Sequence, residues 1–317
     1  MIVVKWFASI SRNTLTGGLS IVKKTVAVVT AVYNRKDTMK RLFESLKTQT
    51  SKDFYWLIVD DGSDDNIFDD IQAYRDEADF EIEFFSKENG GKHTALNLAF
   101  EKVDSDLFFT VDSDDYLTKD AISTIVCDWK NLKNNDRICS IIYLKGYSQS
   151  KVIGEPFQVD HIIANDIDMR ERHYVAGDKA EVFRSDLLKK YRFPVYEGEK
   201  FQGENYVWWQ LAAERDSYYV NRIIYIGEYL NGGLSKSGRC LRISCPRGGM
   251  DNSKMGMKTI FPLKKRVKRA ILYVCYSKFA GLKAKNAIGN SGFPALATIC
   301  YLPGVLLYAY WKNTVKR

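Results

Sequence analysis

Apolar, β-rich runs alternate with segments of helical periodicity through the first third of the chain, and this alternation restricts the fold most. The apolar runs are Thr25–Tyr33, Tyr55–Asp60, Glu81–Phe85 and Asp106–Asp112. The segments between them, with apolar residues recurring every three or four positions, are Asp37–Thr48, about Asp65–Arg75 and Lys92–Lys102. Strands that alternate with helices form a mostly parallel sheet flanked by helices. We therefore predict an α/β fold of this kind.

The second half of the chain is less regular. Ile138–Gly146 and Tyr218–Ile226 have the composition of strands, whereas Ser185–Tyr191 and Asn205–Glu214 favour helices. The glycines and serines of Asn231–Gly238 predict a flexible loop.

Three carboxylates crowd the end of the fourth apolar run, at Asp112, Asp114 and Asp115. In open α/β sheets, ligands bind at the carboxyl ends of the strands. A divalent ion such as Mg²⁺ is held by one or two carboxylates together with substrate phosphates, and its charge offsets their mutual repulsion. Asp112, Ser113 and Asp114 form an Asp-x-Asp that fits this task. The alternative is a solvated acidic turn.

Two further motifs lie at strand ends. In "VDDGSDD" (Val59–Asp65), Asp60 or Asp61 can accept a hydrogen bond from a nucleotide base, or the segment caps the next helix. In "ENGGKHTALN" (Glu88–Asn97), two glycines and Lys92 open a helix, where backbone amides favour a phosphate. We interpret His93 as structural.

These motifs resemble one family. "VVTAVYNR", "VDDGSDD", "GGKHTALN" and "VDSDDYL" occur in the order and spacing of family 2 glycosyltransferases, which have the GT-A (Rossmann-like) nucleotide-sugar-binding fold. The resemblance covers about Thr25 to Ile226. The later segment Gly177–Trp209 is similar to bacterial members that build capsule and other surface polysaccharides.

The resemblance implies roles for individual residues. Thr30, Ala31 and Tyr33 would cradle the nucleotide base and ribose, and Asp61 would read the uracil edge. Arg35 and Lys92 would lie near ribose or phosphate. The donor-binding Asp-x-Asp would be Asp112, Ser113 and Asp114, with Asp112 and Asp114 holding Mg²⁺ or Mn²⁺ and Asp115 close to the sugar.

Family members of this kind invert the anomeric centre, which implies one base for the acceptor hydroxyl. Glu204, at the start of the predicted helix Asn205–Glu214, is the candidate, with Glu197 and Glu199 as alternatives. Many members have Glu-Asp here, whereas this chain has Glu204 followed by Asn205. The helix dipole lowers the pKa of a carboxyl at this position, so partial burial must offset it in a working base.

Other residues have two interpretations each. Trp208 is expected to stack on an acceptor sugar or to pack in the core. Asp178 and Lys179 are expected to lie in a loop that closes over the donor, where Asp178 contacts a sugar hydroxyl and Lys179 a phosphate. Alternatively, the two form a structural ion pair. The Gln-x-x-Arg-Trp signature of processive synthases is missing, so we expect one sugar per encounter.

The positive charge of the chain is concentrated at one end. From Tyr229 to Arg317 there are 17 Lys/Arg and one acid, and residues 1–228 are net acidic. A cationic cluster at 264–269 precedes apolar residues that we expect to enter an anionic membrane surface: Ile271, Leu272, Val274, Cys275 and Phe279. The uncharged stretch 286–311 favours an interfacial or re-entrant segment over a span, since prolines and glycines interrupt it. Nucleic acid is the rival partner, and we do not expect it, because the apolar stretch suits lipid better.

We expect an N-terminal extension (1–23), a GT-A domain (24–228) and a basic, helical, membrane-associating region (229–317). The predicted function is metal-dependent, inverting transfer of a hexosyl or N-acetylhexosaminyl group. A nucleotide sugar, with UDP expected, would be the donor and a lipid-linked glycan the acceptor, at the cytoplasmic face of the membrane. A cysteine pattern without Cys-x-x-Cys fits that reducing compartment. The alternative is a non-catalytic, membrane-tethered partner of another transferase that binds sugar nucleotides or glycans.

Overall fold

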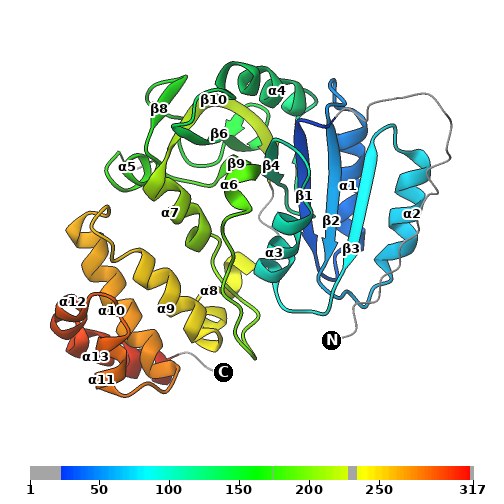
Figure 1. Ribbon diagram of the computed structural model, residues 1–317. Coiled ribbons are helices and arrows are strands. Elements are labelled where there is room, and N and C mark those ends of the chain that lie inside the picture. Colours follow the sequence, from blue (N-terminus) through cyan, green and yellow to red (C-terminus); the bar gives the residue numbers. More distant parts are fainter. Residues whose placement is uncertain (1–22, 174, 228–233, 315–317) are drawn as a thin grey trace.

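The computed structural model describes residues 23–173, 175–227 and 234–314, with the side chains of 234–237 left aside (Figure 1). The predicted N-terminal extension therefore lies outside the described residues, apart from Lys23. One ten-stranded sheet runs through the body in the order β3-β2-β1-β4-β9-β6-β10-β5, with β7 paired to β6 and β8 to β10. The strands are β1 Val26–Val32, β2 Phe54–Asp60, β3 Glu81–Ser86, β4 Leu107–Thr110, β5 Tyr116–Leu117, β6 Ile138–Ser148, β7 Lys151–Val152, β8 Ile162–Ala164, β9 Lys179–Arg184 and β10 Asp216–Ile226.

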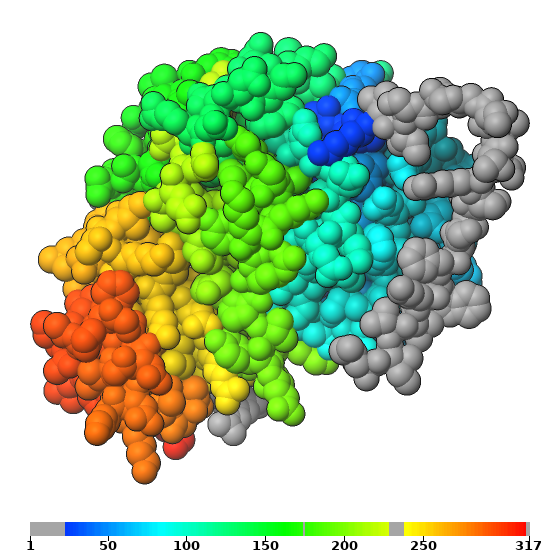
Figure 2. Space-filling model, in the orientation of Figure 1, coloured from blue at the N-terminus to red at the C-terminus, as the bar shows by residue number. Residues whose placement is uncertain are grey.

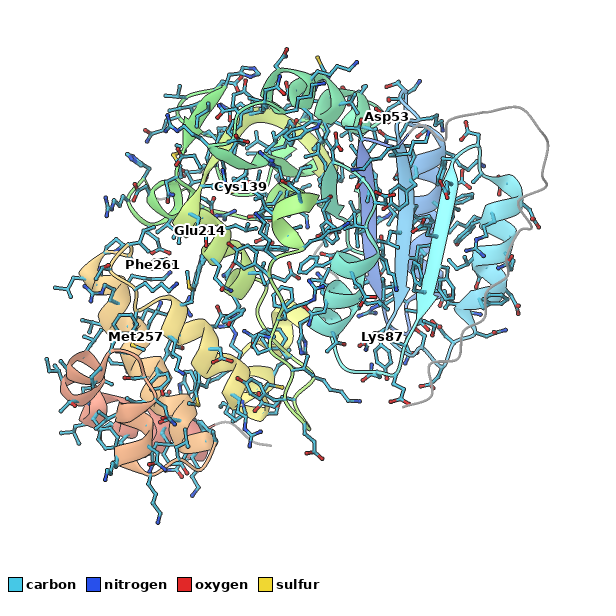
Figure 3. All side chains as sticks on the ribbon, viewed as in Figure 1. Asp53, Lys87, Cys139, Glu214, Met257 and Phe261 are labelled. Carbon is cyan, nitrogen blue, oxygen red and sulfur yellow. The ribbon has the colours of Figure 1, made fainter. Side chains whose placement is uncertain are left out.

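The long strands point the same way, apart from β9. β1 pairs in parallel with β2 and β4, β2 with β3, and β6 with β10, while β9 lies antiparallel between β4 and β6. The carboxyl ends of β1, β2, β4, β6 and β10 therefore meet at one edge. Figure 3 marks the two edges, with Asp53 before β2 and Lys87 after β3. The predicted α/β fold with a mostly parallel sheet is confirmed.

Helices cover both faces of the sheet and bury its alternating apolar side chains. On one face, α1 (Lys36–Lys47), α2 (Ile67–Glu77) and α4 (Ala121–Leu132) pack around Trp56 and Phe109. On the other, α3 (Lys92–Lys102), α6 (Ser185–Leu188) and α7 (Asn205–Glu214) pack around Phe108 and Phe183. A short helix, α5 (Asp166–Glu171), lies beside α7. Because both faces are covered, only the edges of the sheet are open for a ligand.

Two predictions for the second half need correction. Lys179 does not lie in a loop but begins β9, a strand that the sequence analysis missed. Of the predicted flexible loop Asn231–Gly238, residues 231–233 lie outside the described part of the chain, and 234–238 belong to α8 (Leu234–Ser244). The helix is kinked at Gly238, where φ is 26° and ψ is −94°. Glycine adopts a positive φ easily. The glycine that suggested a loop therefore lies at a kink within a helix.

The basic end of the chain folds into helices that pack on the body (Figure 1). α10 (Leu263–Phe279) lies at their centre, in contact with α9 (Pro246–Met255), α11 (Ala284–Gly289), α12 (Pro294–Ile299) and α13 (Tyr301–Thr314). Trp209 of α7 meets Phe261 edge to face at 5.1 Å between ring centroids. In Figure 3, Phe261 accordingly lies beside the body, and Met257 lies further into the helices.

The expectation that the apolar face of α10 enters a membrane is wrong. Val274 and Cys275 are fully buried, because α9 and α13 cover that face. Within the described ranges, none of the helices combines the length and the apolar composition that a membrane crossing requires. The uncharged stretch 286–311 is divided among α11, α12 and α13.

Much of the predicted cationic cluster also points inward. Lys265 forms an ion pair with Glu171 of α5 at 2.5 Å, and Arg266 donates to the carbonyl of Met257 at 3.0 Å. The Arg269 guanidinium lies 4.7 Å from the centroid of the Trp209 ring. Only Lys264 and Lys268 of the cluster are exposed. The cluster therefore attaches the C-terminal helices to the body, and its charge is only partly available to a membrane.

Candidate active site

The three aspartates that follow β4 come together at the carboxyl edge of the sheet. One carboxylate oxygen of each of Asp112, Asp114 and Asp115 lies within 4.8 Å of the others. Asp115 is buried, and its carboxylate accepts from Lys145 Nζ at 2.9 Å and from the Tyr225 hydroxyl at 2.7 Å. The same hydroxyl accepts the backbone N–H of Asp112 at 3.0 Å. We call Asp112–Asp115 the acidic turn. Side chains from two strands that are distant in the sequence, β6 and β10, thereby fix its conformation.

Lys145 of β6 and Tyr225 of β10 are site residues that the sequence analysis missed. Lys145 Nζ lies 4.1 Å from the centroid of the Tyr225 ring, so the two side chains support one another. Both stand near the carboxyl ends of strands, at the same edge as Asp112. Lys145 is the one charged residue of β6, which was the available signal in the sequence.

The chemistry of this turn fits a divalent cation. Burial raises the pKa of the Asp114 carboxyl above its ordinary value, and the negative charges of Asp115 and Asp112 raise it further. Among the described residues, no ion pair reaches the Asp114 carboxylate; Arg41 donates instead to its backbone carbonyl. A bound cation would offset this repulsion, and carboxylate oxygens are the ligands that Mg²⁺ and Mn²⁺ take. Asp112 and Asp114 are the residues that would hold it.

Lys92, the first residue of α3, joins the acidic turn to the predicted base. Its Nζ lies 2.6 Å from Asp112 Oδ1 and 2.7 Å from Glu204 Oε1. Burial alone would lower the pKa of Lys92, but the charges of Asp112 and Glu204 raise it well above its ordinary value. In turn, the Lys92 ammonium holds the pKa of Asp112 below its usual range. The Lys92 ammonium thus holds the Glu204 carboxylate, from the second half of the chain, beside the Asp-x-Asp.

Glu204 lies where the sequence predicted, directly before α7, whose first residue is Asn205. The side chain is half-buried and does not cap its own helix. The alternative Glu199 has a different task, because its two carboxylate oxygens accept the backbone N–H groups of Arg247 and Gly248 at 2.9 and 3.0 Å. It therefore caps the N-terminus of α9. Glu197 is exposed on the preceding loop. Of these three, only Glu204 is linked to the acidic turn, through the shared ion pairs of Lys92.

Glu181 of β9 is a further acid near Glu204, and the sequence analysis did not predict it. Burial raises the pKa of the Glu181 carboxyl to about 7, and the charges of Asp166 and Glu204 add to the rise, against the lowering effect of Arg170. The Arg170 guanidinium is 2.5 Å from Glu181 Oε1. Glu181 is therefore a second carboxyl able to take a proton near Glu204, although it is tied to Arg170.

Asp61 holds the loop that leads into α3. Its carboxylate accepts from Lys87 Nζ at 2.6 Å and from the backbone N–H groups of Gly90 and Gly91 at 3.0 and 2.7 Å. Asn89 adds a side-chain bond to the Asp61 carbonyl at 2.9 Å. The strand end "VDDG" and the loop "ENGG" are therefore one structural unit. The role of Asp61 in reading uracil stays a prediction.

The residues at the end of β1 have different accessibilities. Thr30 is 0% exposed, and its hydroxyl accepts the Trp56 indole N–H at 3.0 Å. The prediction that Thr30 lines the nucleotide site is therefore wrong. Tyr33 is 45% exposed and Ala31 is half-buried, so both stay candidates. Arg35 is exposed, and its charge lowers the pKa of Asp114, which places it toward the acidic turn.

Two predicted contacts in the second half are wrong. Trp208 is only 6% exposed and stacks on Phe183 with 4.3 Å between ring centroids, so its faces are covered by the core. The Lys179 ammonium is buried and donates to the Ala176 carbonyl at 2.7 Å, which turns it away from a phosphate. Asp178 is exposed just before β9, and its predicted sugar contact stays untested.

Gly91 is required where the segment that precedes Glu204 crosses the start of α3. Its φ is +95°, and a Cβ there would lie 2.0 Å from the Lys200 carbonyl oxygen. We expect Gly91→Ala to lower the free energy of unfolding by about 3 kcal/mol or more, because backbone strain and a clash add. Gly198→Ala is the matched control, since φ is +76° there but nothing lies within 4 Å of the added Cβ. It should cost only about 1–2 kcal/mol. Equal losses in urea unfolding would contradict the close approach.

The comparisons with known proteins agree with this geometry. The sequence profile of the family described as Glycosyl transferase family 2 matches residues 27–189, about half of the chain. The chain belongs to this family. The matched region contains β1 to β4, the acidic turn and Lys92, whereas Glu204 and Tyr225 lie beyond it.

Individual relatives are distant. Glycosyltransferase GlyA of Streptococcus pneumoniae is 29% identical over 105 residues, which are 33% of this chain but 15% of GlyA. A Rickettsia felis uncharacterized glycosyltransferase is 37% identical over 97 residues, 31% of this chain and 16% of its own length. The chain thus matches less than a fifth of either relative. The GalNAc(5)-diNAcBac-PP-undecaprenol beta-1,3-glucosyltransferase of Campylobacter jejuni is 22% identical over 63% of each protein.

Solved structures show the same fold over nearly the whole chain. S. aureus TarS 1-349, crystallised with UDP, has a TM-score of 0.60 at 14% identity and covers 92% of this chain and 93% of TarS 1-349. The mannosyltransferase PcManGT of Pyrobaculum calidifontis, in complex with GDP-Man and Mn²⁺, has a TM-score of 0.55 at 14% identity, covering 94% and 86%. At these identities the likeness shows the fold alone, and that fold is GT-A.

Proposed function

We propose that this chain is a metal-dependent, inverting glycosyltransferase that uses a nucleotide-sugar donor. One observation carries the proposal: the Lys92 ammonium contacts Asp112 at 2.6 Å and Glu204 at 2.7 Å. A carboxylate able to act as a base therefore stands beside the aspartates that fit a metal–diphosphate. Inversion needs donor and base on opposite sides of the reacting carbon, within one small site.

The donor in this proposal is a UDP-sugar. Tyr33 and Ala31, at the end of β1, and Asp61, at the end of β2, lie at the edge where a nucleotide binds in α/β sheets. TarS was crystallised with UDP and UDP-GlcNAc, which supports UDP by analogy of fold. Arg35 and Lys92 supply positive charge for the phosphates. The transferred group would be a hexose or an N-acetylhexosamine.

Asp112 and Asp114 would hold the divalent cation at this edge. When bound, the cation neutralises the diphosphate that leaves the sugar. Asp115 stabilises the turn through its hydrogen bonds with Lys145 and Tyr225. We also propose that Asp115 lies close to the donor sugar. Ser113, buried between the two metal ligands, belongs to the same turn. The charge of Arg35 opposes repulsion at Asp114.

Glu204 would accept the proton of the attacking hydroxyl at its carboxylate. Lys92 orients this carboxylate through an ion pair, which occupies one of its oxygens while the contact lasts. A donor diphosphate competes for the Lys92 ammonium, because phosphate oxygens are strong acceptors for it. Donor binding would therefore free Glu204 to act. This order of events couples a filled donor site to an active base.

The acceptor in this proposal is a glycan linked to a membrane lipid, at the cytoplasmic face. The Campylobacter jejuni relative, whose name includes a PP-undecaprenol acceptor, supports this class of acceptor. Residues 24–228 would carry the chemistry, and 229–317 the membrane association. Exposed Asp178 is the proposed contact to a sugar hydroxyl.

The proposal is tested by incubating the full chain with a panel of UDP-, GDP- and dTDP-sugars and Mn²⁺. We expect slow hydrolysis of one UDP-sugar, which lipid-linked acceptors accelerate. Hydrolysis of a GDP-sugar alone would replace the donor assignment. Binding of a donor with no turnover, even with lipid-linked acceptors, would favour a non-catalytic binding partner instead.

A further inference from the structure

Helix α13 presents a second apolar face that nothing within the described residues covers. Leu302, Leu306 and Tyr310 follow one another at intervals of four, so they share one side of the helix. They are 67%, 62% and 58% exposed. Ile299, just before α13, is 76% exposed. We call these four residues the apolar patch.

The opposite face of α13 is already packed in the helical region. Gly304 is buried, and a Cβ there would lie 2.5 Å from Val274 Cβ of α10. Tyr308 meets Phe279 edge to face at 4.7 Å, and Trp311 meets Tyr276 at 6.0 Å. The patch is therefore not the core face of a displaced helix. α13 is apolar on both sides, and a helix of that kind is normally covered on both.

The charged residues of the helices that carry and flank the patch, α11 to α13, are all basic. No Asp or Glu occurs from residue 252 to the C-terminus. Lys312 is exposed on α13, and Lys283 and Lys285 are exposed at the start of α11, which packs against α12. Lysines beside exposed leucines and a tyrosine are typical of a surface that enters the headgroup region of an anionic bilayer. Large exposed apolar groups in such a group mark an interaction site.

We propose that the apolar patch on α12 and α13, with Lys283, Lys285 and Lys312, is a docking surface for an anionic lipid bilayer. The proposal deepens the membrane association in the proposed function, and it does not depend on the proposed chemistry. α13 would lie along the bilayer surface, with its Leu302, Leu306 and Tyr310 side inserted and its Gly304 side still packed on α10.

A second copy of the chain is the other plausible occupant, and charge disfavours it. Two copies packed patch to patch would bring the two sets of lysines together without an acid in the region to pair them. Anionic headgroups supply the missing negative charge and attract basic residues near the bilayer surface.

The position in the molecule fits this task. Figures 1 and 2 show α11–α13 gathered at one end of the molecule, with α2 at the other end beyond the sheet. A bilayer at the patch would therefore leave the sheet and its nucleotide edge outside the lipid. The surface lies on helices other than α10, the one that sequence periodicity favoured.

The test is flotation of the full chain with vesicles of phosphatidylcholine alone or of phosphatidylcholine mixed with anionic phosphatidylglycerol. We expect binding to the anionic vesicles only. Leu302→Asn combined with Leu306→Asn should weaken it at least tenfold. Phe68→Asn is the matched control, because Phe68 is 47% exposed but lies on α2, at the far end. Lys283→Glu with Lys285→Glu should also weaken binding and remove part of its salt dependence.

Equal binding by the Leu302/Leu306 variant and the Phe68→Asn control would overturn the proposal. So would a wild-type chain that ignores anionic vesicles yet forms a dimer that the same leucine changes dissolve, since the patch would then be a contact between copies. Manganese-dependent UDP binding, measured on every variant, shows whether the body is folded. It also separates the two claims, because vesicle binding can fail while UDP binding holds, and the reverse.

Discussion

Replacing Asp114 with asparagine should abolish sugar transfer while leaving the fold at least as stable as before. The side chain keeps its size but loses the charge that a divalent cation needs. We expect a fall in turnover of about 100-fold or more, since a charge that stabilises the leaving diphosphate is removed. Manganese-dependent binding of UDP, measured by calorimetry, should weaken in parallel.

The sign of the stability change distinguishes this variant from one that merely unfolds. The pKa of Asp114 is raised by burial and by Asp115 and Asp112, so its ionised form is disfavoured in the metal-free fold. That cost is present above the unfolded pKa, and the asparagine removes it. At neutral pH without metal, the variant should melt at the same temperature as the parent chain or higher. Added Mn²⁺ should raise the melting temperature of the parent chain only.

Asp76→Asn provides the matched control, because Asp76 is exposed on α2, away from the acidic turn. It should leave transfer, UDP binding and the response to Mn²⁺ unchanged. Full activity of Asp114→Asn would show that no catalytic metal is bound at this turn. Loss of activity together with a lower melting temperature would show instead that Asp114 has a structural task.

The acidic turn could be predicted from the sequence because its members are neighbours in the chain. Asp112, Asp114 and Asp115 follow a buried strand, and the alternation of strands and helices fixes the edge to which they belong. Lys145 and Tyr225 could not be predicted in the same way. They are 30 and 110 residues from Asp115, and only the pairing of β6 and β10 with the sheet brings them to it.

Apolar patterns predicted which surfaces are covered but not what covers them. Trp208 follows a candidate base, so an acceptor sugar and the core were both possible partners, and Phe183 occupies its face. The apolar side of α10 suggested lipid, yet α9 and α13 fill that place. Thr30 is the opposite case, because a polar residue expected to contact a ligand is buried instead. Its hydroxyl accepts a hydrogen bond from the Trp56 indole N–H inside the body. Such partners depend on long-range packing, which residue spacing does not encode.

For Lys92, the structure adds a contact that the sequence did not predict. The sequence placed it near a phosphate, as the first residue of a helix after two glycines. The structure adds Glu204 as its second partner, from a segment more than 100 residues later. The position of Gly91 against Lys200 explains how that segment comes so close. The acidic turn and the candidate base therefore share one ammonium group.

Replacing Glu204 with glutamine should stop transfer without preventing donor binding. Glutamine keeps an oxygen for Lys92 but cannot accept a proton from a hydroxyl at neutral pH. Removing a general base lowers turnover by about 10²–10⁴-fold. UDP binding with Mn²⁺ should change only a few-fold, because Asp112 and Asp114 are intact. Single-turnover transfer and calorimetry measure the two effects separately.

Two further substitutions make this result specific. Glu214→Gln, at the other end of α7, is the control for helix stability and should transfer at the normal rate. Glu181→Gln tests the rival base, whose pKa of about 7 suits proton transfer near neutral pH. If Glu204 is the base, Glu181→Gln should keep most of the activity and shift the pH profile, because a negative neighbour of Glu204 is lost. A dead Glu181→Gln beside an active Glu204→Gln would transfer the role of base to β9.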